Sequence, residues 1–481
     1  MYSKKVSELF ACKHLHMCYF FHILRRAELS LFRIFWFLFL IFTLLCLTFP
    51  LFFRHPPPNI ESPLTKGQPM KVNGIIAEYN PFHNGHRYQI EQAKRLTGAD
   101  YTIIVLSGNF TQRGEPAIID KFVRTRIALH NGADLVIELP VFHSAGSAEY
   151  FARGGVSILN QLGVVTHICF GSECGSIEPM REIAQIILDE PESYLEDLKS
   201  GQAAGLSYPA ARNRALTDYY PKLAQNASLL TSPNNILGIE YMKALLSMKS
   251  SIEPVTILRF GSNYHTRFLE SDFCSALALR EAIWAGQNLS LLEPQMPDSA
   301  FEILCSSLKE TPPIHLNDFS KMLLYKLLME QDHGFDRFFD VTSDLSDRIK
   351  NNLKKFDGYH NFCELLKTKN MTHTRISRCL LHIMLDMKDV ETTSHNHMDL
   401  VPYARVLGFR KEAAPLLSAI KKYSEIPLIT KLADAESILN PQAYSTLVQD
   451  MRRSSVYESV AALKSGRSAR DERQIPIEVI E

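Results

Sequence analysis

Short apolar runs alternate with helical patterns along the chain after Met70. The runs have the length of strands and are rich in Ile, Val and Leu, as is typical of strands buried on both faces. They comprise residues 71–77, 101–106, 134–139 and 167–170. Helical spacing of apolar residues occupies 118–130 and 147–162, and Gly132 and Gly163 follow where helices commonly end.

This alternation predicts an α/β fold with a Rossmann-like, doubly wound parallel sheet, whose ligand lies at the carboxyl ends of its strands. A further strand is predicted at 255–259. After about residue 269 the alternation stops and helical spacing dominates. We therefore predict a catalytic domain at 70–268 and an α-helical C-terminal domain at 269–481.

The turn after the first predicted strand contains His83-Asn84-Gly85-His86 and opens a helical pattern. The first N–H groups of a helix lack intrahelical partners and the helix dipole is positive there, so a phosphate can bind at this point. Two imidazoles three positions apart could flank that phosphate and donate hydrogen bonds as negative charge develops. We therefore predict His83 and His86 as catalytic residues, with helix capping or metal binding as the alternative.

Other polar segments follow the ends of neighbouring predicted strands. Residues 107–116 follow the second strand and 171–173 the fourth, and Arg259 ends the later strand. Arg113, Lys121 and Arg124 could meet phosphates or RNA, with a solvated basic face as the alternative; for Arg126 we favour the solvated face. Asn234 or Asn235 could bind a ribose or base edge, or cap the helix that begins there.

Three carboxylates, Glu78, Glu115 and Glu173, could orient a ligand or hold Mg²⁺ through water. The sequence contains neither a P-loop nor a Gly-x-Gly-x-x-Gly motif after a strand. Nine cysteines occur without a Cys-x-x-Cys pair, which favours reduced thiols over a zinc site. We predict no resident metal site.

Charge is uneven although the 481-residue chain has no net charge. Residues 1–69 hold eight Lys/Arg and three Asp/Glu, which leaves a net charge of −5 on the chain from Met70. A polyanion must therefore meet a local basic patch. Candidate RNA contacts lie in the helical region and are Lys367, Lys369, Arg375 and Arg378. We expect the nearby His373 and His382 to be packed in the protein or to lie at its surface, and not to serve as ligands.

Residues 34–53 form an uncharged apolar segment long enough to span a bilayer. Its flanking charges weakly favour an outward-facing body, which would separate a nucleotide-using enzyme from ATP. Met70, by contrast, stands directly before the first strand, as a translation start would. We expect residues 1–69 to be a leader from a mis-assigned start and the protein to be cytoplasmic, with a membrane anchor through 34–53 as the alternative.

Taken together, these motifs resemble those of the tRNA(Met) cytidine acetate ligases, a branch of the nucleotidylyltransferase-like enzymes. The resemblance covers essentially everything from Met70. It rests on residues 78–86, 107–110 with 112–117, 132–140, 170–173 and 233–241.

The resemblance implies ATP-dependent activation of acetate to acetyl-adenylate, then transfer of the acetyl group to N4 of the wobble cytidine of elongator tRNA(Met). It implies tRNA(Met), acetate and ATP as partners, with Mg²⁺ inferred from ATP and no obligate protein partner evident. The positions that match the family's ATP-binding residues are Ile76, Ala77, Glu78, Tyr79, Asn80, Pro81, Phe82, His83, Asn84, Gly85, His86, Arg87, Tyr88, Gln89, Gly171, Asn234 and Arg259.

Two alternatives remain at this point. An enzyme of the same fold could transfer adenylyl groups to a small phosphorylated metabolite, although the long helical region would then be unexplained. The second alternative is a membrane-tethered RNA-binding protein without catalytic activity. The intact His83, Gly85 and His86 argue against this alternative.

Overall fold

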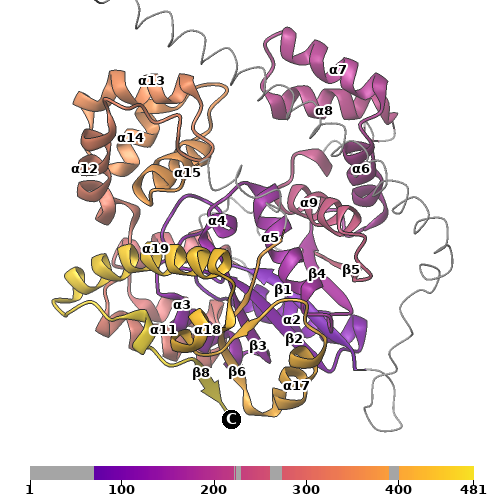
Figure 1. Ribbon diagram of the computed structural model, residues 1–481, viewed down its shortest axis with the longest axis vertical. Coiled ribbons are helices and arrows are strands. Elements are labelled where there is room, and N and C mark those ends of the chain that lie inside the picture. Colours follow the sequence, from indigo (N-terminus) through magenta and orange to yellow (C-terminus); the bar gives the residue numbers. More distant parts are fainter. Residues whose placement is uncertain (1–69, 222, 224–228, 260–273, 389–399) are drawn as a thin grey trace, which may run out of the picture. The chain divides into compact units, whose positions relative to one another are not determined.

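The computed structural model describes residues 70–481 except 222, 224–228, 260–273 and 389–399. Its centre is an eight-stranded sheet (Figure 1). The strands are β1 (Val72–Ala77), β2 (Tyr101–Ser107), β3 (Leu135–Leu139), β4 (His167–Ser172), β5 (Glu253–Leu258), β6 (Ala404–Arg410), β7 (Leu428–Ile429) and β8 (Glu478–Ile480). They run in the order β5-β4-β1-β2-β3-β6-β7, with β8 also paired to β6. All pairs are parallel except β3 with β6.

The chain moves outward from β1 in both directions, to β2 and β3 on one side and to β4 and β5 on the other. A doubly wound sheet binds its ligand at this reversal, because the loops that leave the adjacent strands part there and open a crevice. The five strands expected from the sequence all form, which confirms the predicted sheet. Gly132 and Gly163 have positive φ angles of 102° and 69° at the ends of their helices.

Helices cover both faces of the sheet. Those before β5 are α2 (Asn84–Thr97), α3 (Lys121–His130), α4 (Val141–Ser144), α5 (Ala148–Gln161), α6 (Glu178–Asp189), α7 (Glu192–Ala203), α8 (Tyr208–Tyr219) and α9 (Pro233–Ser247). Those after it are α10 (Ala276–Trp284), α11 (Asp298–Glu310), α12 (Ser320–Glu330), α13 (Ser343–Asn352), α14 (Tyr359–Leu366), α15 (His373–Met384), α17 (Ala414–Tyr423), α18 (Ala435–Ile438) and α19 (Pro441–Ser465). Short 3₁₀ turns are η2 (Leu289–Gln295), η3 (Leu316–Phe319), η4 (Leu353–Lys355), η5 (Lys411–Ala413), η6 (Leu432–Asp434) and η7 (Glu472–Gln474).

The strands read as continuous apolar runs because both of their faces are buried. Along β2, Ile103 and Val105 enter the core beneath α5 and α9, whereas Ile104 and Leu106 enter the core beneath α2, α3 and α10. Side chains alternate between the faces of a strand, so a run without alternation needs cover on both sides. Helices α12–α15, drawn in orange in Figure 1, share a separate core that also takes in Phe110 and Tyr457.

The chain beyond residue 269 is mostly helical, as predicted, but it also supplies β6, β7 and β8. These strands were not predicted. Strand β6 contains Arg405, Gly408 and Arg410 and only one β-branched residue, so it lacks the usual strand pattern. Residues 70–481 form one compact unit, and the boundary expected after residue 268 stays a prediction. No helix among the described residues is long and apolar enough to cross a membrane, and the apolar segment 34–53 lies outside them.

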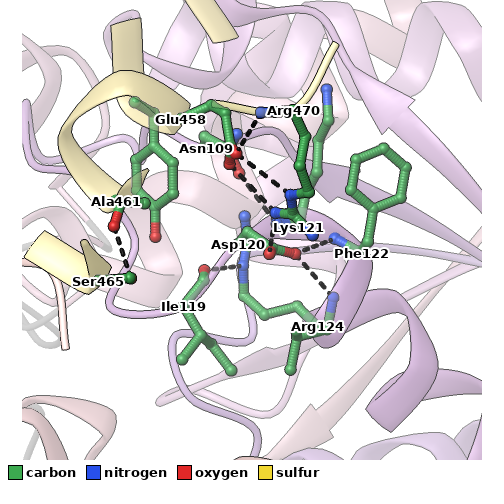
Figure 2. Close-up of polar contacts among 12 residues, drawn as sticks. Asn109, Ile119, Asp120, Lys121, Phe122, Arg124, Glu458, Ala461, Ser465 and Arg470 are labelled. Carbon is green, nitrogen blue, oxygen red and sulfur yellow. Dashed lines mark hydrogen bonds and ion pairs between the residues drawn. The ribbon is translucent and has the colours of Figure 1, made fainter. Parts of the chain in front are cut away.

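Helix α19 and the tail after it fix the loop that follows β2. The Asn109 side chain accepts a hydrogen bond from the Lys121 backbone N–H at 2.9 Å and donates to Ser454 Oγ at 3.1 Å. Figure 2 shows Asp120 beside Arg470 and Glu458; the Arg470 guanidinium lies 3.1 Å from a carboxylate oxygen of each. The C-terminal segment therefore holds the segment between β2 and α3 at both of its ends.

Gly114 should be the least replaceable glycine of this loop. Its φ angle is +74°, and an added Cβ would lie 2.3 Å from the backbone nitrogen of Arg378 in α15. We expect Gly114→Ala to lower the free energy of unfolding by about 2–4 kcal/mol, because left-handed strain and a backbone clash add. Gly98→Ala is the matched control: its φ is +63° but nothing lies within 4 Å, so strain alone should cost about 1 kcal/mol. Chemical denaturation of both variants checks this, and equal losses would remove the clash from the account.

Candidate active site

Two adjoining cavities lie at the carboxyl ends of β1 and β4, where the sheet reverses direction. The larger, of about 190 Å³, is lined from β1 and its turn by Glu78, Tyr79 and Asn80, and from across the crevice by Asn234 and Arg259. The smaller, of about 70 Å³, extends past Gly85 and Tyr88. The residues that line both are His83, His86, Gln89, Gly171, Arg259 and Ser275.

His83 and His86 begin α2 in a reciprocal cap. His83 Nδ1 accepts from the Gly85 backbone N–H at 3.1 Å, and His86 Nδ1 accepts from the His83 backbone N–H at 3.2 Å. Because each Nδ1 accepts a hydrogen bond, each neutral ring carries its proton on Nε2. The two rings stack with centroids 3.7 Å apart. Capping and ligand binding are therefore compatible, since capping uses Nδ1 and leaves Nε2 as a donor.

Both imidazoles are held neutral. Burial, and next the positive charge of Arg259, lower the pKa of His83 to about 3. Burial, followed by His83 and Arg259, also lowers the pKa of His86 well below its usual range. At neutral pH the rings can thus donate hydrogen bonds from Nε2 without first losing or gaining a proton.

Buried groups behind the two histidines fix the turn. The Tyr79 backbone has a positive φ of 47°, and its ring contacts those of Phe82 and His86, each at a centroid distance of 4.8 Å. Asn80 Oδ1 accepts from the Ile118 backbone N–H at 2.9 Å, and the Asn80 carbonyl accepts from Arg280 Nη1 at 2.7 Å. Such support is what a preorganised donor pair requires.

The opposite wall joins β4, β5 and the start of α9. Glu173 caps α9: its carboxylate accepts from the Asn234 side chain at 2.7 Å and from the Asn235 backbone N–H at 2.8 Å. Asn235 Oδ1 in return accepts from the backbone N–H groups of Glu173 and Cys174 at 3.0 and 3.1 Å. A Cβ on Gly171 would lie 3.2 Å from the Arg259 side chain, so glycine allows that side chain to lie close to β4.

The chain matches a family model and several known proteins. The family model described as HIGH nucleotidyl transferase matches residues 70–472. The chain is similar to tRNA(Met) cytidine acetate ligases of Acetivibrio thermocellus, at 44% identity over 76% of this chain and 89% of the relative, and of Caldicellulosiruptor saccharolyticus, at 40% over 81% and 94%. Solved structures of Thermotoga maritima TmcAL superpose with a TM-score of 0.80 for an apo form and 0.78 for one bound with alpha-thio ATP. Both are 32% identical, and each comparison covers 85% of this chain and 100% of that one.

The chain belongs to the tRNA(Met) cytidine acetate ligase family.

In this ligase-family chain, most of the predicted ATP segment lines the cavities. Those residues are Ile76, Ala77, Glu78, Tyr79, Asn80, His83, Gly85, His86, Tyr88 and Gln89. Pro81 and Phe82 are buried behind the turn. The Asn84 side chain donates to the Pro294 carbonyl at 2.9 Å, and Arg87 pairs with Glu91 at 2.8 Å. The assignment of ATP contacts to the whole segment, and to Gly171, Asn234 and Arg259, remains a prediction.

The carboxylates suggested for Mg²⁺ differ in their surroundings. Glu78 lines the larger cavity while its Oε1 accepts from the Gln112 backbone N–H at 2.7 Å. Glu173 is engaged by α9, and Glu115 lies 4.0 Å from Arg280. Glu78 is thus the one of the three that lines the larger cavity.

The suggestion that one face of α3 presents Lys121 and Arg124 to phosphates was wrong for this ligase-family fold. Arg124 is fully buried, and its guanidinium donates to the backbone carbonyls of Glu78 and Ser107 at 2.7 and 2.9 Å. Lys121 is buried between the carboxylates of Glu138 and Glu472. Glu472 of the C-terminal segment covers Lys121, whereas Arg124 lies against the carbonyls at the ends of β1 and β2. The local spacing could reveal neither set of partners. Arg126 is half-exposed and pairs with Glu478, so the preference for an exposed face was sound there.

Several cavity residues were missed, among them Tyr241, Ser275 and Arg280. Tyr241 lay within a motif quoted for the family, which was a usable signal. Ser275 and Arg280 reach the crevice from the start of α10, nearly 200 residues from the histidine turn, and no local pattern marks them.

The four candidate RNA contacts lie on or near α14 and α15. Lys367 and Lys369 are exposed, and Lys367 Nζ is 3.5 Å from Glu364. Arg375 and Arg378 share Asp340, at 3.3 and 3.7 Å. His382 is buried between the carbonyls of Phe339 and Ala145, which confirms it as a packed residue.

Proposed function

We propose that this protein activates acetate with ATP and ligates the acetyl group to a cytidine of tRNA(Met). Membership of the acetate ligase family and the similarity to TmcAL bound with alpha-thio ATP support this function. The observation that carries the chemical argument is the pair of neutral imidazoles that keep Nε2 as a donor at the start of α2.

The first step joins acetate to the adenylyl group. A carboxylate oxygen of acetate attacks the α-phosphorus of ATP, the bond to the β-phosphate oxygen breaks, and pyrophosphate leaves with that electron pair. Negative charge shifts onto the phosphoryl oxygens as this happens, and fixed N–H donors stabilise it without reorganising. His83, His86 and the positive charge of Arg259 are the groups that line both cavities and suit this role.

The second step forms the amide. The N4 amino group of the wobble cytidine attacks the acetyl carbonyl carbon, AMP leaves with the bonding electrons, and one proton is lost from N4. A wobble base lies in a single-stranded loop, so its Watson–Crick edge can enter a pocket without opening a duplex. We propose elongator tRNA(Met) as substrate and N4-acetylcytidine as product.

ATP contacts are proposed for residues 76–89 together with Gly171, Asn234 and Arg259. Magnesium would accompany the nucleotide, since charge neutralisation and positioning dominate reactions at phosphorus. The Glu78 carboxylate would bind that ion directly or through water, because Glu78 lines the cavity. Helices α12–α15 would contact the tRNA body, through Lys367, Lys369, Arg375 and Arg378.

The proposed function predicts acetate-dependent labelling of tRNA. The protein is incubated with ATP, radiolabelled acetate and tRNA(Met), and label is followed into RNA; the matched control replaces the wobble cytidine of the tRNA by uridine. We expect label only with the cytidine, and acetate-dependent exchange of pyrophosphate into ATP without tRNA. Label that requires acetyl-CoA would exclude the ligase, and adenylylation of a phosphorylated metabolite would favour the alternative enzyme.

A further inference from the structure

A second cluster of ligand-type side chains lies on α14 and α15. His360 and Glu364 are one turn apart on α14, and His373 is the first residue of α15. One potential ligand atom from each lies within 4.8 Å of those of the other two. His373 Nε2 is 3.6 Å from Glu364 Oε1, and the two imidazole centroids are 5.1 Å apart.

The inner edge of this cluster has a polar atom without a hydrogen bond. His373 Nε2 is buried and has no hydrogen-bond partner. A neutral imidazole with an unused nitrogen is competent to bind a metal ion, and nearby carboxylates favour a cation.

We propose that His360, Glu364 and His373 bind a divalent transition-metal ion, with Zn²⁺ the best match to the donors. Two imidazoles and one carboxylate suit zinc, and three protein ligands leave a fourth position for water. Ligands at about 2.1 Å in a tetrahedron are about 3.4 Å apart. The 3.6 Å between His373 and Glu364 is near that value, so small side-chain rotations would complete the site.

The backbone around the cluster is already fixed. Arg348 donates to the carbonyls of Leu366 and Lys367 at 2.6 and 3.3 Å, which anchors the end of α14. The Thr372 side chain caps α15 next to His373. A bound ion would therefore join the two helices across residues 367–372 at a small further entropic cost.

The ion would also change the charge at the corner that carries Lys367 and Lys369. Glu364 now faces Lys367 through Oε2, at 3.5 Å, and His373 through Oε1. A metal on Oε1 would neutralise this carboxylate and weaken its attraction for Lys367. The proposed site does not depend on the acetate ligase chemistry.

The sequence predicted neither this site nor a ligand role for His373. The three residues follow no standard zinc motif, because the third comes from a second helix. Only the packing of α14 against α15 brings them together.

Zinc binding by the full chain tests the proposal. Equilibrium dialysis would compare the wild type with His360→Ala, Glu364→Gln and His373→Ala. The matched control is His333→Ala, because His333 on the adjoining segment faces one carboxylate, Glu330, at 3.9 Å without a second imidazole. We expect each cluster variant to lose one bound zinc or to bind it at least about tenfold more weakly, and the control to bind as the wild type.

Co²⁺ absorption and zinc-edge anomalous scattering give a direct readout should a variant fail to fold. Tetrahedral d–d bands and an anomalous peak between the three side chains of the wild type would support the site. Unchanged zinc binding in folded His360→Ala and His373→Ala variants, or a zinc-saturated crystal without a peak there, would overturn it.

Discussion

Replacing His86 by alanine is expected to lower the rate of acetyl-adenylate formation by about 10²–10³-fold while tRNA(Met) binding persists. The variant loses the Nε2 donor and also the Nδ1 acceptor that caps the His83 backbone N–H at 3.2 Å. Acetate-dependent pyrophosphate exchange measures the rate of acetyl-adenylate formation. A filter-binding assay measures the affinity for tRNA(Met). Turnover equal to that of the wild type would remove His86 from the mechanism.

His86→Asn separates catalysis from capping. The asparagine side-chain oxygen occupies about the place of Nδ1 and can keep the cap, but nothing replaces Nε2. We expect the same loss of rate with little loss of stability. His315→Asn is the control, because His315 also accepts a backbone N–H through Nδ1, that of Asn317 at 3.1 Å, away from the cavities. Its cap corresponds to that of His83, and it tests whether asparagine can replace a capping imidazole. This control should keep full activity.

The pH profile provides a further check on the two histidines. Their pKa values are lowered, to about 3 for His83, so both rings stay neutral from mildly acidic to neutral pH. The exchange rate should therefore show no acid limb near pH 6.5, the ordinary pKa of histidine. An acid limb near pH 6.5 that is present in the wild type and absent from the His86→Asn variant would mean that the His86 imidazole titrates in this range. Our account of its protonation would then be wrong.

The histidine turn could be predicted because its signal is local. A buried strand, a glycine and a helix start within fifteen residues predict a phosphate site through elementary helix geometry. Gly171 and Arg259 could be added because strand ends at a topological switch lie close together. Asn234 stands at a helix start, and its assignment came from the resemblance to the family. Arg280 could not, since only tertiary packing brings α10 to the crevice, nearly 200 residues from the histidine turn.

The missed strands have a related cause. Strand β6 pairs with β3 through backbone hydrogen bonds, which do not depend on side-chain type, and its Arg405 is tolerated because Glu138 and Glu472 surround it. A charged residue normally argues against a buried strand. Only the tertiary partners, one of them in the last ten residues of the chain, reverse that expectation.

The same buried charges explain why Lys121 was misplaced on a phosphate-binding face. Lys121 and Arg405 lie between Glu138 and Glu472, so two cations balance two largely buried carboxylates. Burial alone would raise the pKa of Glu472, but Lys121 and Arg405 lower this pKa to about 2. The cluster joins α3, β3 and β6 to the C-terminal tail, close behind the loop that Asn109 and Gly114 shape.

Lys121→Met is therefore expected to lower the free energy of unfolding by about 3–5 kcal/mol, because it leaves a buried carboxylate without a full counter-charge. Arg126→Met is the matched control on the same helix: its guanidinium is 46% exposed and pairs with Glu478, so the loss should stay below about 1 kcal/mol. Urea denaturation of the two variants measures the difference.

Adding Glu472→Gln to Lys121→Met tests the cause of that loss. The double variant removes the excess negative charge while the amide keeps nearly the size of the carboxylate, so part of the lost stability should return. If burial of an uncompensated charge were not the cause, the second substitution would add its own cost instead. A double variant less stable than Lys121→Met would thus show that the four groups act through packing and hydrogen bonds rather than through charge balance.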